Sequence, residues 1–253
     1  MSELRAYLEQ LVAAPTAEQL WDIHCARMAD YGFDRILYGF SHFMSSGSYG
    51  DPNDFVLLTN HDSAYMERFI GDGLYRDAPM TRWAVENDGA SSWSYLAARM
   101  SAGTLTEREK SVIAFNRAHD VTAGYSISFP AMTRRSKGAV ALTARKGLQQ
   151  DDVDAIWQAH GEDIALMNNV AHLRILTLPF RLPGRKLTHR QREALEWVGS
   201  GKTTQDIAQI MGLTSATIEK HLRLARESLD VETTAQAVLK ATFHNQIFVV
   251  DPL

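Results

Sequence analysis

Near the C-terminal end of this sequence, three short helical patterns follow one another, and a residue suited to cap a helix precedes each of them. Thr188, then Thr203 or Thr204, then Thr214 stand at these places, where a threonine hydroxyl accepts a hydrogen bond from a free amide of the first turn. Gly212 follows the second pattern, where a helix end often needs a left-handed backbone. This order predicts a small all-α unit with a tight turn between its second and third helices.

The third pattern, which runs to about Leu229, separates an apolar face from a charged one. Its apolar residues recur at spacings of four, three and four, as on an amphipathic helix: Ile218, Leu222, Ala225 and Leu229. The opposite face begins with small residues, which let a helix end enter a groove, and continues with charged ones: Ser215, Ala216, Glu219, Lys220, Arg223 and Glu227. The pattern predicts a helix-turn-helix that reads duplex DNA.

Individual contacts can be assigned on this hypothesis. Lys220 and Arg223 carry donors that can reach guanine edges, and Ser215 lies at the front of the helix. The residues placed to reach phosphates are Lys202, Thr214, His221 and Arg226. The alternative interpretation of this face is a solvent-exposed helix with incidental charge.

Specific binding by a single helix-turn-helix usually requires two copies on half-sites about one turn apart. We therefore expect a homodimer on an inverted-repeat operator in promoter DNA. Val238, Ala241 and Asn245 lie on a further helical pattern after Thr233 and form a narrow stripe of the kind that could pair two copies.

The charge distribution agrees with one DNA-facing end. Residues 181–253 hold ten Lys or Arg and eight Asp or Glu, a balance of +2, within a chain whose net charge is −4. The remainder therefore carries −6. A mildly basic end on an acidic body suits a DNA-binding module attached to a domain with another task, although surfaces often differ by this much.

The composition, 45% hydrophobic and 22% charged over 253 residues, is that of a globular protein with one or two domains. No stretch approaches the ~18 apolar residues of a membrane span, and MSELRAYLEQ lacks the apolar core of a signal peptide, so we expect a cytoplasmic location without a membrane partner. The single cysteine, Cys25, excludes an internal disulfide and a cysteine-rich zinc site. We expect no metal.

The first 176 residues mix helical and strand-like patterns. Strands are predicted over 35–43, 55–59, 125–132 and 139–144, and helices over most of the first 30 residues and over 63–70, 80–86, 106–119 and 151–176. This order predicts an α/β/α sandwich with an antiparallel sheet, followed by a four-helix unit, hence an α+β protein. The segment TLPFRLPGRK, with two prolines and a glycine, predicts a linker over 177–186 between domains 1–176 and 187–253.

The C-terminal segment resembles the LuxR-type helix-turn-helix across its whole length, LTHRQREALEWVGSGKTTQDIAQIMGLTSATIEKHLRLARESLDVETTAQAV. The matching positions include Leu187, Thr188, Arg190, Leu195, Gly201, Lys202, Ile207, Ala208, Gly212, Thr217, His221, Leu222 and Leu229. The chain departs from the family pattern at Gln191, Ser228 and Thr234, where the family commonly has Glu, Lys and Arg. The resemblance implies a transcription regulator, and the two lost cations imply fewer phosphate contacts.

The N-terminal part resembles the autoinducer-binding domain of quorum-sensing LuxR-type regulators. The similarity is carried by YRDAPMTRWAVENDGASSW from Tyr75 to Trp93, then GYSISFP and GAVALTA. The resemblance implies that an acyl-homoserine lactone is enclosed between the sheet and a layer of helices. In the family, a tryptophan indole donates to the lactone carbonyl, an aspartate accepts from the amide N–H, and a second tryptophan forms a wall.

Carried over by position, this chain keeps the wall as Trp93 but changes the polar contacts. Tyr65 replaces the donor tryptophan, Phe69 replaces its partnering tyrosine and Ala78 replaces the aspartate. Thr143 matches a hydroxyl that faces the acyl carbonyl. Two further aromatic residues and one serine complete the expected pocket: Tyr38, His61 at its mouth, and Ser126 where the family has a glycine, unless a shift of two residues brings Gly124 there. Taken singly, each aromatic also suits an ordinary core.

The change at Ala78 is unfavourable for the lactone amide. A buried amide N–H without an acceptor costs ~1–3 kcal/mol, or about 10- to 100-fold in affinity, and Asp77 could accept only if the backbone shifted by one residue. Three interpretations stay open: an ordinary lactone held by altered contacts, a different small apolar signal molecule, or no ligand. We expect poor binding of ordinary lactones.

Other functional classes fit less well. The sequence has no glycine-rich phosphate loop, no Gly-x-Ser-x-Gly elbow and no His-Glu-x-x-His, so we do not expect an enzyme. It opens with helices rather than with the acidic strand ends of a phosphorelay receiver. The alternative to a ligand-responsive regulator is a ligand-independent one, or one that acts through a partner protein.

Overall fold

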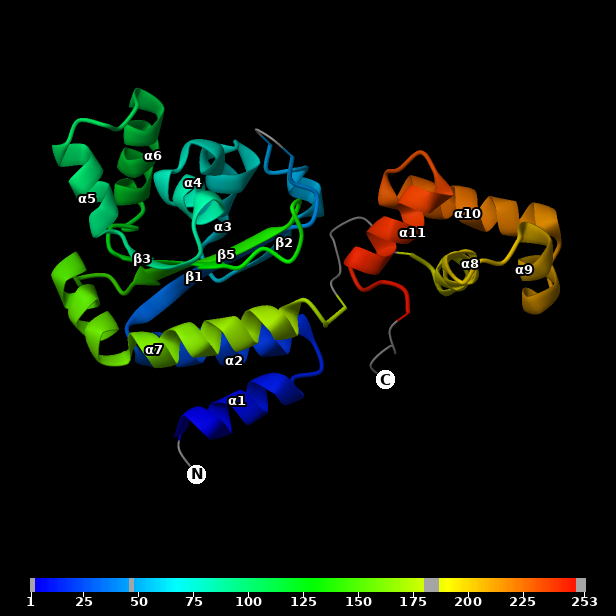
Figure 1. Ribbon diagram of the computed structural model, residues 1–253, viewed down its shortest axis with the longest axis horizontal. Coiled ribbons are helices and arrows are strands. Elements are labelled where there is room, and N and C mark those ends of the chain that lie inside the picture. The colour runs from blue at the N-terminus through cyan, green and yellow to red at the C-terminus, as the bar shows by residue number, and fades with distance from the viewer. Residues whose placement is uncertain (1–2, 46–47, 180–186, 249–253) are drawn as a thin grey trace. The chain divides into compact units, whose positions relative to one another are not determined.

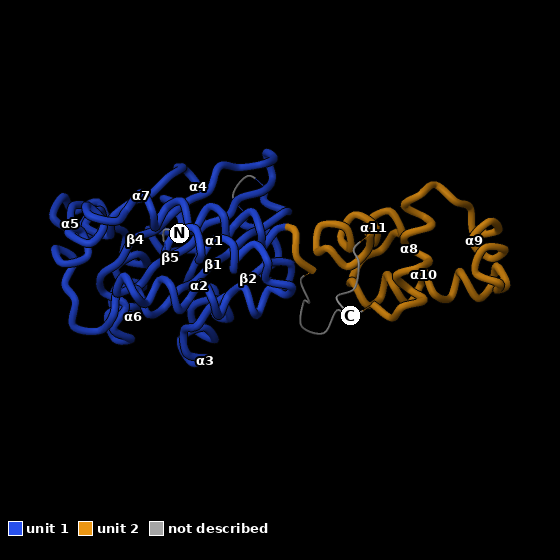
Figure 2. The backbone as a smooth tube through the Cα atoms, turned by 90° about the horizontal axis from the view of Figure 1, so that it is seen from below, with its two compact units in different colours: residues 1–176 blue, residues 177–253 orange. Residues whose placement is uncertain are grey.

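The computed structural model describes residues 3–45, 48–179 and 187–248. The chain divides into two compact units, Met1–Leu176 and Thr177–Leu253 (Figure 2). Of the linker expected over 177–186, residues 180–186 lie outside the described residues.

The first unit is built on a five-stranded antiparallel sheet with the strand order β2-β1-β5-β4-β3. Helices cover both faces, α1, α2 and α7 on one and α3 to α6 on the other (Figure 1). The predicted α/β/α sandwich with an antiparallel sheet is therefore confirmed. The strands are β1 (Phe33–Ser41), β2 (Val56–Thr59), β3 (Gly89–Ser92), β4 (Gly124–Phe129) and β5 (Lys137–Ala144).

Capping residues set the starts of the helices in this unit. Thr16 accepts from the amide of Gln19 at the start of α2, and Thr106 and Glu109 form a capping box at the start of α6. The helices are α1 (Glu3–Ala13), α2 (Ala17–Asp30), α3 (Ser63–Met66), α4 (Pro79–Glu86), α5 (Ser94–Ser101), α6 (Glu107–Ala118) and α7 (Gln150–Ile175).

Two elements that the sequence did not indicate are β3 and α5. β3 reads GASS, an edge strand of small residues without the alternation that marks a half-buried strand. α5 has no buried residue, and its apolar residues Leu96, Ala97 and Met100 line the cavity. The helix predicted over 63–70 is present as α3 followed by a π-helical turn over Glu67–Gly71, a rare geometry that often occurs near functional sites.

The layer formed by α1, α2 and α7 encloses a buried polar network. The Tyr7 hydroxyl lies 2.6 Å from His24 Nδ1, and His24 Nε2 lies 3.0 Å from Asn168 Oδ1. A second histidine, His172, stacks on Phe129 with ring centroids 4.0 Å apart. Burial lowers the pKa of both histidines to about 4. Both rings are therefore neutral near pH 7, and His24 joins these helices through hydrogen bonds rather than through a charge of its own.

The second unit contains α8 (His189–Gly199), α9 (Thr204–Met211), α10 (Ser215–Leu229) and α11 (Thr234–Phe243). Each begins after a threonine whose hydroxyl accepts from the third residue of the helix, and Thr203 rather than Thr204 caps α9. Gly212 ends α9 with φ of 65°, the left-handed backbone that glycine adopts without strain. The core is an apolar cluster that includes Leu195, Ile207 and Ile218, all fully buried.

The pairing stripe expected on α11 is wrong. Ala241 is fully buried in the core of the unit, and Asn245 donates from Nδ2 to the carbonyl of Leu178. The cause is the helix period, which turns these positions toward α8 and α10. Leu239 is the large apolar side chain of α11 that faces solvent, at 50% exposure.

In the part of the chain that the structure describes, no helix is long and apolar enough to cross a membrane.

Candidate ligand cavity and DNA-binding surface

A cavity of about 460 Å³ lies between the sheet and the helical layer of α3 to α6. This volume is within the range of small-molecule sites, roughly 300–1,000 Å³. Alternate residues of a strand point to the same face, so β1 contributes Leu37 and Gly39, and β5 contributes Ala139, Ala141 and Thr143.

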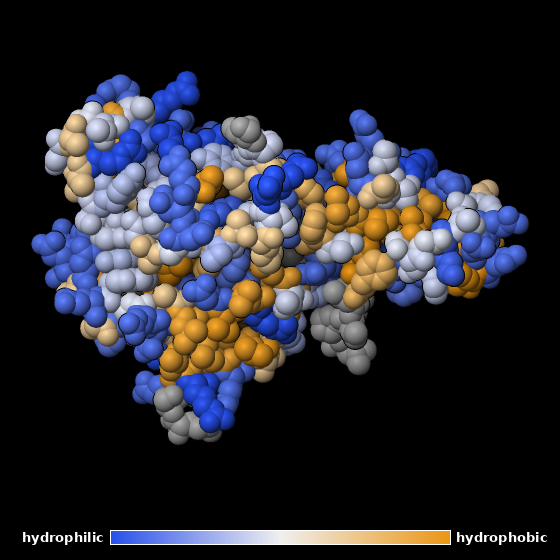
Figure 3. Space-filling model, in the orientation of Figure 1, coloured by the Kyte–Doolittle hydropathy of each residue, from blue (hydrophilic) through white to orange (hydrophobic). Residues whose placement is uncertain are grey.

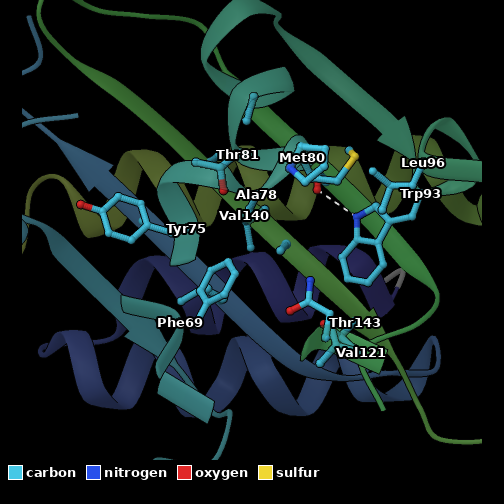
Figure 4. Close-up of a pocket in the computed structure, with 18 of the residues that line it drawn as sticks. Phe69, Tyr75, Ala78, Met80, Thr81, Trp93, Leu96, Val121, Val140 and Thr143 are labelled. Carbon is cyan, nitrogen blue, oxygen red and sulfur yellow. Dashed lines mark hydrogen bonds between the residues drawn. The ribbon is translucent and has the colours of Figure 1, made fainter. Parts of the chain in front are cut away.

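Side chains from the helical layer close the cavity (Figure 4). Phe69 and Tyr75 lie on one side of the view, and Trp93 and Leu96 lie on the other. Ala78 is placed between them, where α4 begins. The residues that meet here are far apart in the sequence. The cavity therefore forms only when the helices pack onto the sheet.

All the expected ligand-site residues but one line this cavity: His61, Tyr65, Phe69, Ala78, Trp93, Ser126 and Thr143. The exception is Tyr38, which is a correction. Its neighbours Leu37 and Gly39 face the cavity, so Tyr38 points to the opposite face of the sheet. There its hydroxyl lies 2.9 Å from His172 Nδ1, and its ring packs against Trp21 and Phe129.

The indole N–H of Trp93 is already used within the protein. It donates to Ser126 Oγ at 3.0 Å, the hydrogen bond drawn at Trp93 in Figure 4. Gly124 provides the room for this ring, because a Cβ there would lie 3.0 Å from Cη2 of Trp93 and 2.2 Å from the Leu142 carbonyl oxygen. Ser126 faces the cavity and Gly124 packs against the indole, so the two residues have separate tasks.

A column of stacked rings forms another wall. His61, Tyr65 and Phe69 follow at intervals of four residues, with ring centroids 4.7 Å and 5.3 Å apart along the column. Phe115 of α6 stacks on Tyr65 from another side, at 5.3 Å. The Tyr65 hydroxyl donates to Asn116 Oδ1 at 3.1 Å.

This environment controls the charge of the titratable groups. Burial, and then the nearby Arg35, lower the pKa of His61 to about 4, so the ring is neutral near pH 7. Burial raises the pKa of the Tyr65 hydroxyl above its usual value. Both residues therefore act as neutral hydrogen-bonding groups.

The position of Ala78 leaves the helical wall without an acidic group. Its backbone N–H donates to the Tyr75 carbonyl, and its methyl group faces the cavity. Asp77, one residue earlier, is not among the lining residues, so the backbone shift that would bring it in does not occur. Among the described lining residues, the one carboxylate is that of Asp151, which is exposed near the start of α7.

Sequence reasoning missed Asn116, Tyr75, Met80 and Thr81, which also line the cavity. The signal for Asn116 was present in the helical period, because it follows the fully buried Val112 by one turn of α6. For Tyr75 no local pattern existed, since it lies in the short 3-10 turn Leu74–Asp77. Met80 and Thr81 lie in the first turn of α4, and which side of that turn faces the cavity depends on how α4 packs on the sheet.

In the second unit, α9, the Gly212 turn and α10 form a helix-turn-helix. The Thr204 hydroxyl donates to Glu219 Oε1 at 2.9 Å and ties the start of α9 to α10. Ser215, Lys220 and Arg223 are exposed on α10, and Arg223 forms an ion pair with Glu227 one turn later. An exposed pair of this kind is worth only ~0–1 kcal/mol, so Arg223 can exchange it for another acceptor at little cost.

The residues predicted to reach phosphates occupy different environments. Lys202 is exposed in the turn before α9. The Thr214 hydroxyl accepts from the amide of Thr217 and caps α10. Arg226 is half-buried and donates to Thr234 Oγ1 at 2.9 Å, and His221 is also half-buried. Lys202 and the exposed residues of α10 therefore form the accessible surface, whereas Arg226 also helps to hold α11.

Comparisons with known proteins cover both units. Residues 16–175 match the model of the autoinducer binding domain, and residues 185–241 match that of the luxR family of bacterial regulatory proteins. The transcriptional activator AnoR of Acinetobacter nosocomialis is 24% identical over 238 residues, which are 92% of this chain and 94% of AnoR. LuxR of Aliivibrio fischeri is 22% identical over 221 residues, covering 87% of this chain and 81% of LuxR.

Solved structures share the fold. Escherichia coli SdiA superposes with a TM-score of 0.54 at 16% identity, over 98% of this chain and 99% of SdiA. CepR2 of Burkholderia cenocepacia, an N-acylhomoserine-lactone-dependent factor, gives a TM-score of 0.51 at 17% identity, over 68% of this chain and 92% of CepR2. The chain belongs to the LuxR family of transcriptional regulators, with an autoinducer-binding domain before its helix-turn-helix, and it is not an enzyme.

Proposed function

We propose that this regulator binds promoter DNA as a homodimer and that its cavity takes a small neutral, mainly apolar molecule in preference to an ordinary acyl-homoserine lactone. The observation that carries the proposal is the cavity itself, about 460 Å³ in volume, whose helical wall presents the methyl group of Ala78. Bacterial promoter DNA lies in the cytoplasm, so we propose that the protein acts there.

The DNA part of the proposal rests on α10. Small residues at the start of this helix let it approach base edges, and Lys220 and Arg223 follow on the same exposed face. Lys202 and the Thr214 end of the helix supply phosphate contacts. Electrophoretic mobility shifts with the full chain and an inverted-repeat operator test this, and operator binding no tighter than binding to random DNA would contradict it.

The homodimer is supported by an apolar strip on the first unit. α1 and α7 pack together, and their outer faces expose Val12 at 54%, Leu166 at 47% and Leu173 at 61%. Figure 3 shows this area as a hydrophobic surface over the two helices. Contiguous exposed apolar patches of this kind often mark interaction sites.

Sedimentation tests the homodimer directly. Leu173→Glu places a charge on the strip without disturbing the core, and we expect it to convert dimers to monomers. Met132→Glu, at a side chain 56% exposed between β4 and β5, is the matched control and should leave the dimer intact. One protomer per operator at saturation would rule out the homodimer.

The ligand part rests on three substitutions that act together. Tyr65, Phe69 and Ala78 stand where the family's lactone contacts would stand, and the Tyr65 hydroxyl is engaged by Asn116. An amide N–H buried against Ala78 would lack an acceptor, at a cost of ~1–3 kcal/mol. The acyl chain could still bind, at ~0.8 kcal/mol for each buried CH₂, but with little selectivity for the head.

Restoring the family's tryptophan donor and aspartate acceptor tests whether their loss weakens lactone binding. Tyr65→Trp combined with Ala78→Asp should increase the rise in melting temperature that N-octanoyl-homoserine lactone produces, because a ligand that binds only the folded state stabilises it. Each single variant serves as a control and should recover only part of the effect. A large, saturable rise for the unmodified protein at sub-micromolar lactone would overturn this part of the proposal.

A further inference from the structure

One corner of the cavity gathers polar side chains around Asn116, a residue to which the lactone pattern assigns no role. The Tyr65 hydroxyl donates to Asn116 Oδ1 at 3.1 Å, and the Tyr65 ring stacks on His61. The Thr143 hydroxyl in turn lies 3.5 Å from His61 Nε2. These contacts join α6, α3, the segment before α3 and β5 into one continuous polar corner within a largely apolar cavity.

The orientation of the Asn116 amide follows from its bond to Tyr65. A carboxamide oxygen accepts, whereas its nitrogen carries two N–H donors. With Oδ1 held by the Tyr65 hydroxyl, Nδ2 is the free end of the group, and no acceptor for it is found among the described residues. Asn116 lines the cavity, so this donor is available to a bound molecule.

Of the other strong donors that line the cavity, Arg117 is exposed and the remaining three are already engaged. Trp93 donates to Ser126, and Lys137 Nζ donates to the Asn87 carbonyl and pairs with Asp88. Gln150 Nε2 donates to the Gly124 carbonyl, and its Oε1 accepts from the Gly124 amide. The polar corner therefore differs from the rest of the wall in offering an uncommitted amide donor.

We propose that Asn116 is the head-group receptor of this cavity and that it donates from Nδ2 to the carbonyl oxygen of a neutral ester or ketone with an apolar tail. The inference rests on the proposed function, because it requires that the cavity bind a neutral apolar molecule. Tyr65 is a positioning residue that holds the amide, and Thr143 is a second hydroxyl within the corner. His61, with its pKa depressed, adds no charge that would favour an anion.

The test uses the full-length protein and two probes, methyl octanoate and octanoate, which share the acyl chain but differ in the charge of the head. Isothermal titration should show saturable binding of the ester and weaker binding of the anion. Arg117, the exposed neighbour of Asn116, would reverse that order if it were the head-group partner. Tighter binding of octanoate therefore overturns the inference.

Asn116→Asp isolates the donor, since it keeps an acceptor for the Tyr65 hydroxyl and replaces Nδ2 with oxygen. We expect it to weaken methyl octanoate binding by about 10- to 100-fold, the effect of leaving a carbonyl without its donor. Tyr65→Phe should give a smaller loss, because it frees the amide to rotate. The matched control is Asn169→Asp on α7, where Nδ2 donates to the Ala165 carbonyl on the other side of the sheet.

The outcomes separate the two levels of the proposal. Ester binding that Asn116→Asp leaves unchanged overturns the role of Asn116, while the apolar-ligand function stands. No binding of either probe to the unmodified protein, together with tight binding of N-octanoyl-homoserine lactone, overturns the proposed function itself. If Asn116→Asp fails to fold by circular dichroism, Asn116→Ala removes the same donor without adding a charge.

Discussion

The helix-turn-helix presents most of its proposed contacts on one exposed helix, whereas the sensor unit collects its own from four strands and the helical layer above them. Arg223 can be replaced without disturbing the core of the second unit, because α10 packs through its opposite face. Replacing Trp93 would disturb the core of the first unit, because this residue is both a wall of the cavity and a buried residue at 9% exposure. Function and stability are therefore separable in the second unit and coupled in the first.

The largest effect should come from breaking that coupling at Trp93. Trp93→Ala removes a buried indole and its hydrogen bond to Ser126, and truncations of this size cost about 3–5 kcal/mol of unfolding free energy. Urea denaturation of the full chain measures the change. A loss below about 1 kcal/mol would show that the cavity wall is not part of the core and that function and stability are separable in the first unit as well.

Acid should destabilise the sensor unit through its buried histidines. Burial lowers the folded-state pKa of His24 and of His172 to about 4, below the ordinary value of 6.5. The unfolded chain therefore takes up protons first as the pH falls. The stability that these neutral rings contribute is fully present above pH 6.5 and is lost between pH 6.5 and 4.

At pH 5 the loss should reach about 2 kcal/mol for each histidine. Denaturation curves collected between pH 7 and pH 5 measure it. His24→Gln should reduce the slope, whereas His189→Gln should not, because the His189 side chain is 79% exposed. A stability that does not change over this range would contradict the prediction.

Arg223→Ala tests whether function and stability are separable in the second unit. We expect a cost of about 1–3 kcal/mol in binding to a specific operator, with a relaxed preference at one base pair. The free energy of unfolding should change by no more than about 0.5 kcal/mol, because the side chain is exposed. Mobility-shift titrations and denaturation measured on the same preparation test both halves of the statement.

Glu227→Ala is the matched control for Arg223→Ala. It removes the ion-pair partner and leaves Arg223 free, so specific binding should be kept or slightly improved. Equal losses for the two variants would mean that the ion pair, and not a contact with DNA, is what α10 requires.

The smallest effect is expected at Lys202. Lys202→Ala should weaken binding to all sequences alike and lower the slope of log K against log salt by about 1, as expected for one lost phosphate contact. Titrations at several salt concentrations measure this slope. A loss confined to the specific operator would mean that Lys202 contacts bases rather than phosphates.

The predictability of the two units follows from how local their interactions are. The helices of the second unit were predicted closely, because Thr188, Thr214 and Gly212 act on residues within one turn of themselves. In the sensor unit the long helices and the main strands were also predicted, but β3 was not, because an edge strand of small residues is defined by its partner β4 rather than by its own pattern.

The candidate site shows the same limit. His61, in the segment before α3, and Tyr65 and Phe69, one helical turn apart, all line the cavity, and their four-residue spacing was visible in the sequence. Tyr38 was placed on the wrong face, because the orientation of a buried strand with apolar residues on both sides cannot be read from its own alternation. Asn116 was missed because its role depends on its contact with Tyr65, which lies 51 residues earlier in the chain.

The hydrogen bond between Trp93 and Ser126 has a consequence for reversibility. Both of its partners belong to the protein, so the indole N–H has its acceptor without any bound molecule. Release of a ligand then leaves no unsatisfied indole N–H behind. A receptor built in this way can follow a falling concentration of its signal as well as a rising one, provided that the rest of its wall remains folded.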